Sequence, residues 1–280
     1  MWRFATGQQF VDGHIINPQN MDLQLKDKVV LVTGGAKGIG AAITRTCAQE
    51  GAIAVAVDRD VQACQRLRDE LSAQGLQLSF IAMDLSPATN CKEIVQRAIA
   101  TFDHIDALVN NAGVNDKVGL EHGNPQEFLS SLERNLLHYY NMAHYTLPHL
   151  KRTRGSIVNI SSKTALTGQG GTSGYVASKG AILGLTREWA AELLPCSIRV
   201  NAVIPAEVMT PLYRQWLDGF PDPQEKLKSV IDKIPFDRRM TTPDEIAAMV
   251  VFLLSTKAGH ITGQHLFVDG GYVHLDRALT

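Results

Sequence analysis

Short apolar runs alternate with longer amphipathic segments along most of the chain. The apolar runs have the length and β-branched content of strands that are buried on both faces of a parallel sheet. The amphipathic segments repeat apolar residues at helical spacing, as Ile39, Ile43 and Cys47 do. The pattern predicts strands over 29–32, 52–57, 78–83, 105–109, 156–160, 198–203 and 266–268. It predicts helices over 38–50, 61–74, 91–102, 125–150, 174–194 and 245–254.

This alternation indicates an α/β fold of the Rossmann type, with a doubly wound parallel sheet in three layers. No Pro/Ser-rich linker or repeat divides the chain, so we assign 21–280 to a single domain. We interpret residues 1–20 as a disordered N-terminal extension. The proline-rich stretch 205–242 follows the carboxyl end of a strand, and we interpret it as a lid over the ligand crevice. The alternative is a purely structural excursion.

Bulk composition narrows the classes of function. The 280 residues carry a formal net charge of −1 and no basic stripe, which argues against nucleic-acid binding. No apolar run reaches the roughly 18 residues that indicate a membrane span, and the first twenty residues lack the pattern of a secretory signal. The four cysteines form no metal-binding or CxxC pattern, so we expect free thiols in a reducing cytoplasm and no metal site.

A glycine cluster after the first predicted strand indicates a dinucleotide site. Gly34, Gly38 and Gly40 lie between an apolar strand and an amphipathic helix. Glycines here allow a tight turn and let a pyrophosphate approach the helix N-terminus, where free backbone N–H groups bind anions. The first gap is three residues, whereas the G-x-G-x-x-G motif has one, but the physical requirement is the same.

Residues near the glycine cluster and the strand ends would choose between NAD and NADP. Asp58 ends the second strand, where a carboxylate accepts hydrogen bonds from ribose hydroxyls and repels a 2′-phosphate. Lys37 and Arg59 could instead hold that phosphate. Because like charges at close range are costly, the sequence favours NAD and leaves NADP open. Asp84 follows the third strand and could bind the adenine edge or cap the next helix.

Tyr175 and Lys179 are four residues apart in a predicted helix, so their side chains share one face. A nearby ammonium group favours the phenolate, and we expect it to lower the tyrosine pKa from about 10 toward neutrality. Such a phenol can take a proton from an alcohol while hydride leaves the same carbon. The spacing alone also fits an ordinary surface pair, so the assignment depends on the other motifs.

Together these motifs resemble the classical short-chain dehydrogenase/reductase family over about 22–272. The matching residues are Thr33-Gly-x-x-x-Gly-x-Gly40, Asn110-Asn-Ala-Gly113, Asn135, Ser162 and Tyr175-x-x-x-Lys179. The resemblance implies a catalytic tetrad of Asn135, Ser162, Tyr175 and Lys179. In it, the serine would bond the reacting oxygen and the tyrosine would transfer its proton. The lysine would lower the tyrosine pKa, and the asparagine would position a water.

The resemblance also implies the wider site. The cofactor contacts would be Gly34, Lys37, Gly38, Ile39, Gly40, Asp58, Arg59, Asp84, Leu85, Asn111, Ala112, Gly113, Tyr175, Lys179, Pro205, Val208 and Thr210. The substrate contacts would be Asn115, Asp116, Ser162, Lys163, Gln169, Tyr175, Glu207 and Arg214. One departure from the family is visible, because Pro205-Ala206-Glu207 stands where Pro-Gly is usual.

The expected substrate set is polar, with few aromatic residues. A buried sugar or polyol needs a partner for every hydroxyl, whereas a steroid or a long acyl chain needs apolar walls. Segments 111–116, 159–169, 204–214 and 268–279 resemble the L-fucose dehydrogenase branch of the family. That resemblance implies NAD- or NADP-dependent oxidation of L-fucose, or a related aldose, at C1 to the lactone.

Alternatives remain open for both the reaction and the assembly. The chain could be a 3-ketoacyl-thioester reductase, another polyol dehydrogenase or a non-catalytic nucleotide-binding subunit. The family resemblance implies a homotetramer, with the apolar run 249–254 at an interface. A core helix would give the same apolar pattern.

Overall fold

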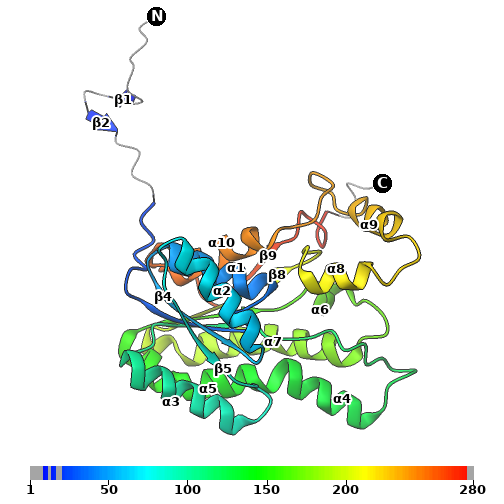
Figure 1. Cartoon of the computed structure of the whole chain (residues 1–280), viewed down its shortest axis with the longest axis horizontal. Helices are drawn as coiled ribbons and strands as arrows, with labels where there is room; N and C mark the ends of the chain where they lie inside the picture. Colours follow the sequence, from blue (N-terminus) through cyan, green and yellow to red (C-terminus); the bar gives the residue numbers. More distant parts are fainter. Residues whose placement is uncertain (1–8, 12–13, 17–20, 276–280) are drawn as a thin grey trace, which may run out of the picture.

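The computed structural model describes residues 9–11, 14–16 and 21–275, so most of the expected extension 1–20 lies outside the described residues. Strands β1 (Gln9–Val11) and β2 (His14–Ile16) pair antiparallel. From residue 21 onward the chain forms a sheet with helices on both faces, as Figure 1 shows. Within the described residues, no helix combines the length and apolar character needed to cross a membrane.

Seven parallel strands form the sheet in the order β5-β4-β3-β6-β7-β8-β9. The strand order reverses between β3 and β6, and the carboxyl ends of strands at such a point are where α/β proteins bind ligands. Each predicted strand is present within two residues of its expected ends. The strands are β3 (Val29–Thr33), β4 (Ile53–Asp58), β5 (Leu78–Ala82), β6 (Ala107–Asn110), β7 (Ser156–Ile160), β8 (Arg199–Pro205) and β9 (His265–Val268).

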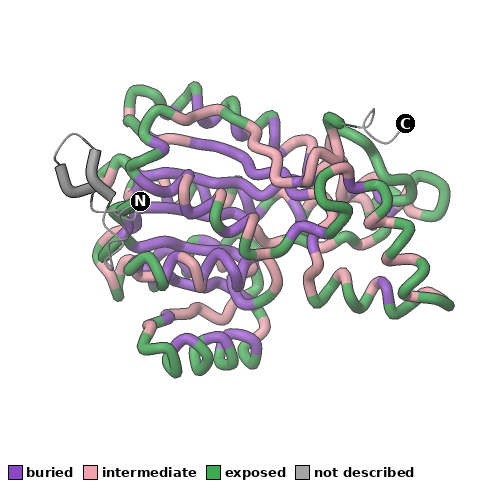
Figure 2. The backbone as a smooth tube through the Cα atoms, turned by 90° about the horizontal axis from the view of Figure 1, so that it is seen from above, coloured by how far each residue is buried: buried purple, intermediate pink, exposed green. Residues whose placement is uncertain are grey.

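Helices cover both faces of the sheet and complete the three layers. One face carries α1 (Gly38–Gln49), α2 (Val61–Ala73) and α10 (Pro243–Leu254). The other carries α3 (Ala88–Phe102), α5 (His138–Thr153) and α7 (Ser173–Glu192). Figure 2 shows the sheet as the buried centre of the molecule. The predicted doubly wound fold is therefore confirmed.

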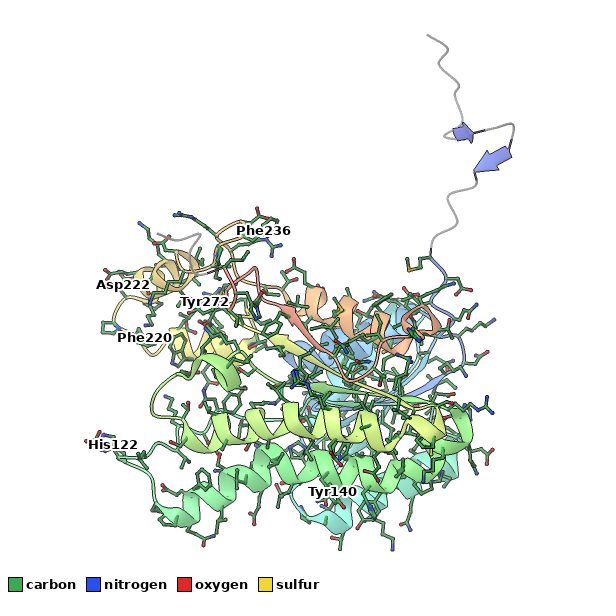
Figure 3. All side chains as sticks on the ribbon, turned by 180° about the vertical axis from the view of Figure 1, so that it is seen from behind. His122, Tyr140, Phe220, Asp222, Phe236 and Tyr272 are labelled. Carbon is green, nitrogen blue, oxygen red and sulfur yellow. The ribbon has the colours of Figure 1, made fainter. Side chains whose placement is uncertain are left out.

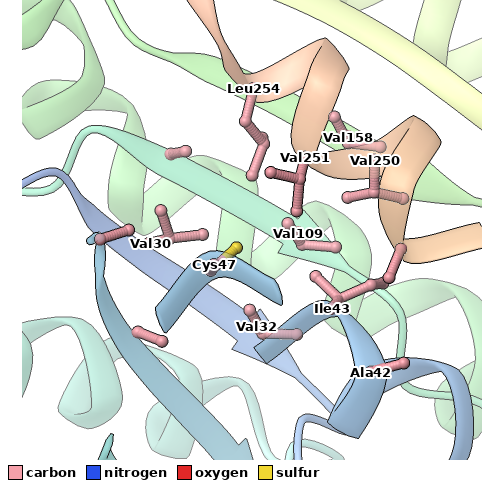
Figure 4. Packing of buried hydrophobic residues seen from close by; sticks show 14 of the residues in the cluster. Val30, Val32, Ala42, Ile43, Cys47, Val109, Val158, Val250, Val251 and Leu254 are labelled. Atoms are coloured by element: carbon pink, nitrogen blue, oxygen red, sulfur yellow. The ribbon is translucent and has the colours of Figure 1, made fainter. Parts of the chain in front are cut away.

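The helix α10 packs on α1 and on the sheet. Val250, Val251 and Leu254 lie beside Ile43 and Cys47 in one core cluster, as Figure 4 shows. Leu253 is also fully buried. The core-helix alternative therefore accounts for most of the apolar run 249–254, without requiring a subunit interface.

A capping box begins α10 and supports a stability prediction. The Thr242 hydroxyl accepts from the Glu245 backbone N–H at 3.2 Å, and the Glu245 carboxylate accepts from the Thr242 backbone N–H at 2.8 Å. We expect Thr242→Ala to lower the free energy of unfolding by about 1 kcal/mol. The matched control is Thr101→Ala on the exposed surface of α3, which should change it by less than about 0.5 kcal/mol. Urea denaturation measures both, and equal effects would contradict the assignment.

The helix predicted over 125–150 is interrupted. It consists of α4 (Pro125–Leu132), a π-helical turn (Glu133–Leu137) and α5. The prediction of one continuous helix was wrong because the widened turn is accompanied by a tertiary contact. The side chain of Asn135, inside that turn, accepts from the backbone N–H of Val114 at 2.7 Å. Such π turns frequently occur at functional sites.

The stretch 205–242 is an insertion whose two ends are joined by backbone contacts. A parallel bridge joins Val208 to Thr241, and the backbone of Thr241 donates to the Glu207 carbonyl at 3.0 Å. The insertion contains α8 (Pro211–Leu217) and α9 (Pro223–Ile231), which Figure 1 shows together at one end of the molecule. Other short helical turns are α6 (Thr164–Thr167), Leu194–Cys196 and Thr256–Ala258.

Candidate active site

A cavity of about 620 Å³ opens at the carboxyl ends of the strands. It is lined by every residue that the sequence assigned to the cofactor, from Gly34 to Thr210. Ser162 also lines it, as do the α8 residues Leu212 and Tyr213. The insertion 205–242 therefore supplies part of the wall, while the strand ends and the glycine loop supply the rest.

The glycine loop is shaped for close approach of a phosphate group. A Cβ on Gly40 would lie 1.9 Å from the Gly34 carbonyl oxygen, so only glycine fits there. Gly34 and Gly38 have φ of +61° and +53°, a region that favours glycine. The Lys37 side chain reaches Asp60 at 2.9 Å and does not cap α1. The first N–H groups of α1 are thus suited to the pyrophosphate of a dinucleotide.

Polar side chains under this loop tie the central strands together. The Thr33 hydroxyl accepts from the backbone N–H groups of Asn111 and Ala112 at 2.9 and 3.2 Å. The Asn111 amide donates to the carbonyl of Thr33 at 2.9 Å. In β6, the Asn110 amide donates to Asn159 of β7 at 3.0 Å. These bonds hold the loop after β6 against the glycine turn, which keeps the floor of the cavity fixed.

The charged residues that would discriminate between NAD and NADP all have partners in the structure. Asp58 is buried, and its carboxylate accepts from the backbone N–H groups of Ala36 and Asp60 at 3.3 and 3.0 Å. Lys37 pairs with Asp60, and Arg59 lies 4.0 Å from Asp84. Both cations considered as phosphate ligands therefore have a carboxylate beside them.

Lys179 is buried behind Tyr175. Its ammonium group donates to the Ile160 carbonyl at 2.8 Å and to the Tyr139 hydroxyl at 3.0 Å. The Tyr139 hydroxyl in turn donates to the same carbonyl at 2.9 Å. Sequence reasoning missed Tyr139, because an aromatic residue in an amphipathic helix reads as core. Its place four residues after Asn135, on the same helix, is the signal that could have identified it.

The pKa values of the tyrosine–lysine pair differ from the expected direction. Desolvation raises the pKa of Tyr175, and the hydrogen bond with Ser162 only partly offsets this increase. Burial lowers the pKa of Lys179 to about 7. The lysine nitrogen lies 5.7 Å from the centre of the Tyr175 ring. The prediction that Lys179 draws the phenol toward neutrality was therefore wrong for the protein chain alone, where burial outweighs that attraction.

The two adjacent serines have separate partners. The Ser161 hydroxyl donates to the Lys179 carbonyl at 2.8 Å, which fixes the end of β7 to α7. The Ser162 hydroxyl accepts from the Thr164 hydroxyl at 3.0 Å, and Ser162 lowers the pKa of Tyr175, with which it lines the cavity. Ser162 is thus the serine that interacts with the tyrosine.

Asn135 is fully buried inside the π-helical turn. Besides accepting from Val114, its amide donates to the Ser131 carbonyl at 3.0 Å. A Cβ placed on Gly113 would lie 3.1 Å from the Asn135 side-chain oxygen and 3.5 Å from the Lys179 nitrogen. Asn135, Gly113 and Lys179 are therefore neighbours, without a direct bond between the two side chains.

The residues expected at the substrate divide into three groups. Ser162 and Tyr175 line the cavity. Lys163 and Glu207 do not line it but form an ion pair with each other, and Glu207 also accepts at 2.7 Å from the hydroxyl of Tyr213, which does line it. The remaining residues do not line the cavity either. Asp116 bonds Ser131 and Arg134, at 3.0 and 2.9 Å, while Asn115, Gln169 and Arg214 are exposed.

Comparison with known proteins identifies the family. The sequence profile described as enoyl-(acyl carrier protein) reductase matches residues 34–273. The chain is 38% identical to the L-fucose dehydrogenase of Mus musculus, covering 87% of this chain and 88% of the relative. It is 33% identical to the 3-oxoacyl-(acyl-carrier-protein) reductase FabG of Thermotoga maritima, covering 90% and 100%.

Solved structures agree with these relatives. The Cj0485 dehydrogenase superposes with a TM-score of 0.87 at 46% identity, over 92% of this chain and 98% of that chain. The L-sorbose reductase of Gluconobacter frateurii, complexed with NADPH and L-sorbose, superposes with a TM-score of 0.86 at 28% identity, over 91% and 99%. With the glycine loop and the serine, tyrosine and lysine gathered at one cavity, these likenesses show that the chain is an oxidoreductase of the short-chain dehydrogenase/reductase family.

Proposed function

We propose that the protein oxidises a sugar or polyol hydroxyl with NAD, and that L-fucose or a related aldose is oxidised at C1 to the lactone. The observation that carries this proposal is the polar cluster of Lys163, Glu207 and Tyr213 beside Ser162. The Lys163 and Glu207 side chains are 11% and 14% exposed, so their charges are largely withdrawn from water. Charged groups next to a reacting centre suit a substrate with several hydroxyls and do not suit an acyl chain.

The proposed chemistry assigns each proton to a side chain. The Ser162 hydroxyl donates a hydrogen bond to the C1 oxygen of the sugar, and the Tyr175 oxygen, in its ionised form, accepts the proton that this oxygen loses. Burial raises the pKa of Tyr175 in the protein chain alone, so this form requires an added positive charge, which the oxidised nicotinamide ring would supply when bound. The Lys179 side chain is held by hydrogen bonds to the Ile160 carbonyl and the Tyr139 hydroxyl. Its nitrogen is the group near Tyr175 that can carry a positive charge. A bound nicotinamide ring supplies the acceptor for the hydride that leaves C1. Tyr213 and the α8 segment help to keep water from this carbon.

A panel of aldoses tests the proposed function. Initial rates with L-fucose, other aldoses and simple polyols are measured with NAD and with NADP. We expect turnover with L-fucose or a closely related aldose, and formation of the lactone identified by mass spectrometry. Turnover of acetoacetyl thioesters with no turnover of any sugar would reject the proposal.

A second candidate is reduction of a 3-oxoacyl thioester. Its specific support is the similarity to the reductase of Thermotoga maritima along that protein's whole length. The same panel separates the two functions when the thioester is assayed with the reduced dinucleotides. Tight binding of the dinucleotide without turnover of either substrate class would instead favour a nucleotide-binding subunit.

The preference for NAD is proposed from Asp58. With Lys37 and Arg59 beside carboxylates, a 2′-phosphate would meet the Asp58 charge with little compensation. We expect Asp58→Asn to lower the ratio of kcat/KM with NAD to kcat/KM with NADP by about tenfold or more. A tenfold change corresponds to about 1.4 kcal/mol of relieved repulsion.

The control for this prediction is Asp69→Asn. Asp69 is an exposed carboxylate on α2 that does not line the cavity, so the NAD/NADP ratio should stay within about twofold of the wild type. A wild-type enzyme that uses NADP more efficiently than NAD would contradict the proposed preference.

We also propose a homotetramer, as the family resemblance implies. The α4–α5 region exposes Leu129, Leu137 and Tyr140 by 53%, 46% and 53%. Figure 3 shows Tyr140 on the outer side of the helical layer, away from Phe220 of the insertion 205–242. Exposed apolar side chains of this size are typical of association surfaces. Sedimentation velocity at micromolar concentration tests the proposal, and a monomer would reject it.

A further inference from the structure

His138 is a buried histidine with an unused ring nitrogen. It begins α5, is 2% exposed and lines the same cavity as the cofactor residues. Its Nε2 lies 3.0 Å from the backbone carbonyl oxygen of Arg134. Its Nδ1 is buried and has no hydrogen-bond partner among the residues that the structure describes. Buried polar atoms are normally paired, so this nitrogen indicates a missing ligand.

The contact with Arg134 decides what kind of ligand is missing. A carbonyl oxygen can only accept, so the Nε2 atom carries the hydrogen and Nδ1 presents a lone pair. Burial lowers the pKa of His138 to about 4, which keeps the ring neutral at physiological pH. The nitrogen therefore requires a partner that donates a hydrogen bond.

The position of His138 indicates which part of the dinucleotide would lie near its Nδ1 atom. The cavity that His138 lines also includes Asp84 and Leu85, which follow β5. Leu85 and Tyr139, the residue after His138, belong to one core cluster, so the chain after β5 and the start of α5 lie in the same region. Asp58 lies at the end of the neighbouring β4, where the ribose hydroxyls are expected. The base attached to that ribose would extend toward β5.

We propose that Nδ1 of His138 accepts a hydrogen bond from the exocyclic amine of the adenine ring. Among the groups on the base edges, that amine is the donor, whereas the ring nitrogen N7 accepts. It carries two N–H groups, and Asp84 provides the acceptor for the second. The histidine is thus a specificity-determining residue for the base. This inference depends on dinucleotide binding and not on the identity of the sugar.

The test is equilibrium binding without any sugar. The dissociation constants of NADH and of its hypoxanthine analogue are measured by the quenching of protein fluorescence. The analogue replaces the amine with a carbonyl oxygen, which would face two acceptors. We expect the wild-type protein to bind NADH at least about tenfold more tightly than the analogue, because the analogue leaves buried acceptors without a donor.

A variant of His138 tests whether this histidine causes the preference for NADH over the analogue. His138→Phe keeps an aromatic ring without the nitrogen, and we expect it to narrow the preference for NADH by about tenfold. The matched control is His149→Phe. His149 lies on the same helix and also has an unpartnered Nδ1 among the described residues, but it is outside the cofactor cavity. This control should leave the preference unchanged.

Three results would overturn the proposal. The first is an unchanged preference in His138→Phe, which would leave Nδ1 to a bound water. The second is an equal loss of affinity for both dinucleotides, which would make the histidine a support of the fold. The third is a wild-type protein that does not distinguish the two dinucleotides, and this result needs no variant to fold. A loss of sugar turnover alone would not bear on these binding constants.

Discussion

Replacing Tyr175 with phenylalanine is expected to lower kcat for sugar oxidation by about 10³-fold or more, while the affinity for NADH stays within about threefold of the wild type. Tyr175 and Ser162 both line the cavity, and the Tyr175 oxygen is the proposed acceptor of the substrate proton. Phenylalanine keeps the ring and therefore its packing on α7. The measurements are steady-state rates with the best aldose and fluorescence titration with NADH.

A tyrosine elsewhere provides the control for this variant. Tyr140 is 53% exposed on α5, so Tyr140→Phe should leave kcat within about twofold. Turnover of Tyr175→Phe above about a tenth of the wild-type rate would show that another group accepts the proton.

The second large effect is expected from Gly40→Ala. The added carbon would lie 1.9 Å from the Gly34 carbonyl oxygen and 2.6 Å from the Asn111 amide nitrogen. Neither atom can yield easily, because the Asn111 amide holds the carbonyls of Thr33 and Gly34. We expect the free energy of unfolding to fall by about 3 kcal/mol and NADH affinity to fall at least about tenfold.

Gly180→Ala is the matched control for this substitution. Gly180 lies in α7, and a Cβ there would meet nothing within 4 Å apart from its two chain neighbours and the nearby backbone of its own helix. Because glycine weakens a helix, this variant should be more stable by about 0.5–1 kcal/mol. Urea denaturation and NADH titration of both variants measure the contrast. A Gly40→Ala protein as stable as the wild type would contradict the described packing of the loop.

Most of the fold could be predicted because its strands are buried on both faces. The run 29–32 is apolar throughout, so it can be recognised without knowing which strands lie beside it or in what register they pair. The interruption at Glu133–Leu137 could not be predicted in this way. It is associated with the bond between Asn135 and Val114, which are far apart in the sequence, and its residues keep a helical pattern.

The candidate site was predictable in position but not in electrostatics. Spacing on α7 and the order of the strands bring Tyr175, Lys179 and Ser162 together. The pKa of a phenol depends on how completely its surroundings exclude water, and sequence spacing carries no such information. For the same reason the sequence does not distinguish His138 from an ordinary buried histidine. Only the position of its Arg134 contact shows which nitrogen is left without a partner.

The wide turn before α5 also constrains how this enzyme can vary in length. A π turn closes i→i+5 hydrogen bonds, so it holds about one residue more than a turn of α-helix. Deleting one residue from Glu133–Leu137 would let the turn close as α-helix, and α5 would keep its orientation relative to α4. The loss would fall on Asn135, whose side chain accepts from the Val114 backbone N–H from within the widened turn. The surplus residue is thus linked to one tertiary contact beside the catalytic groups.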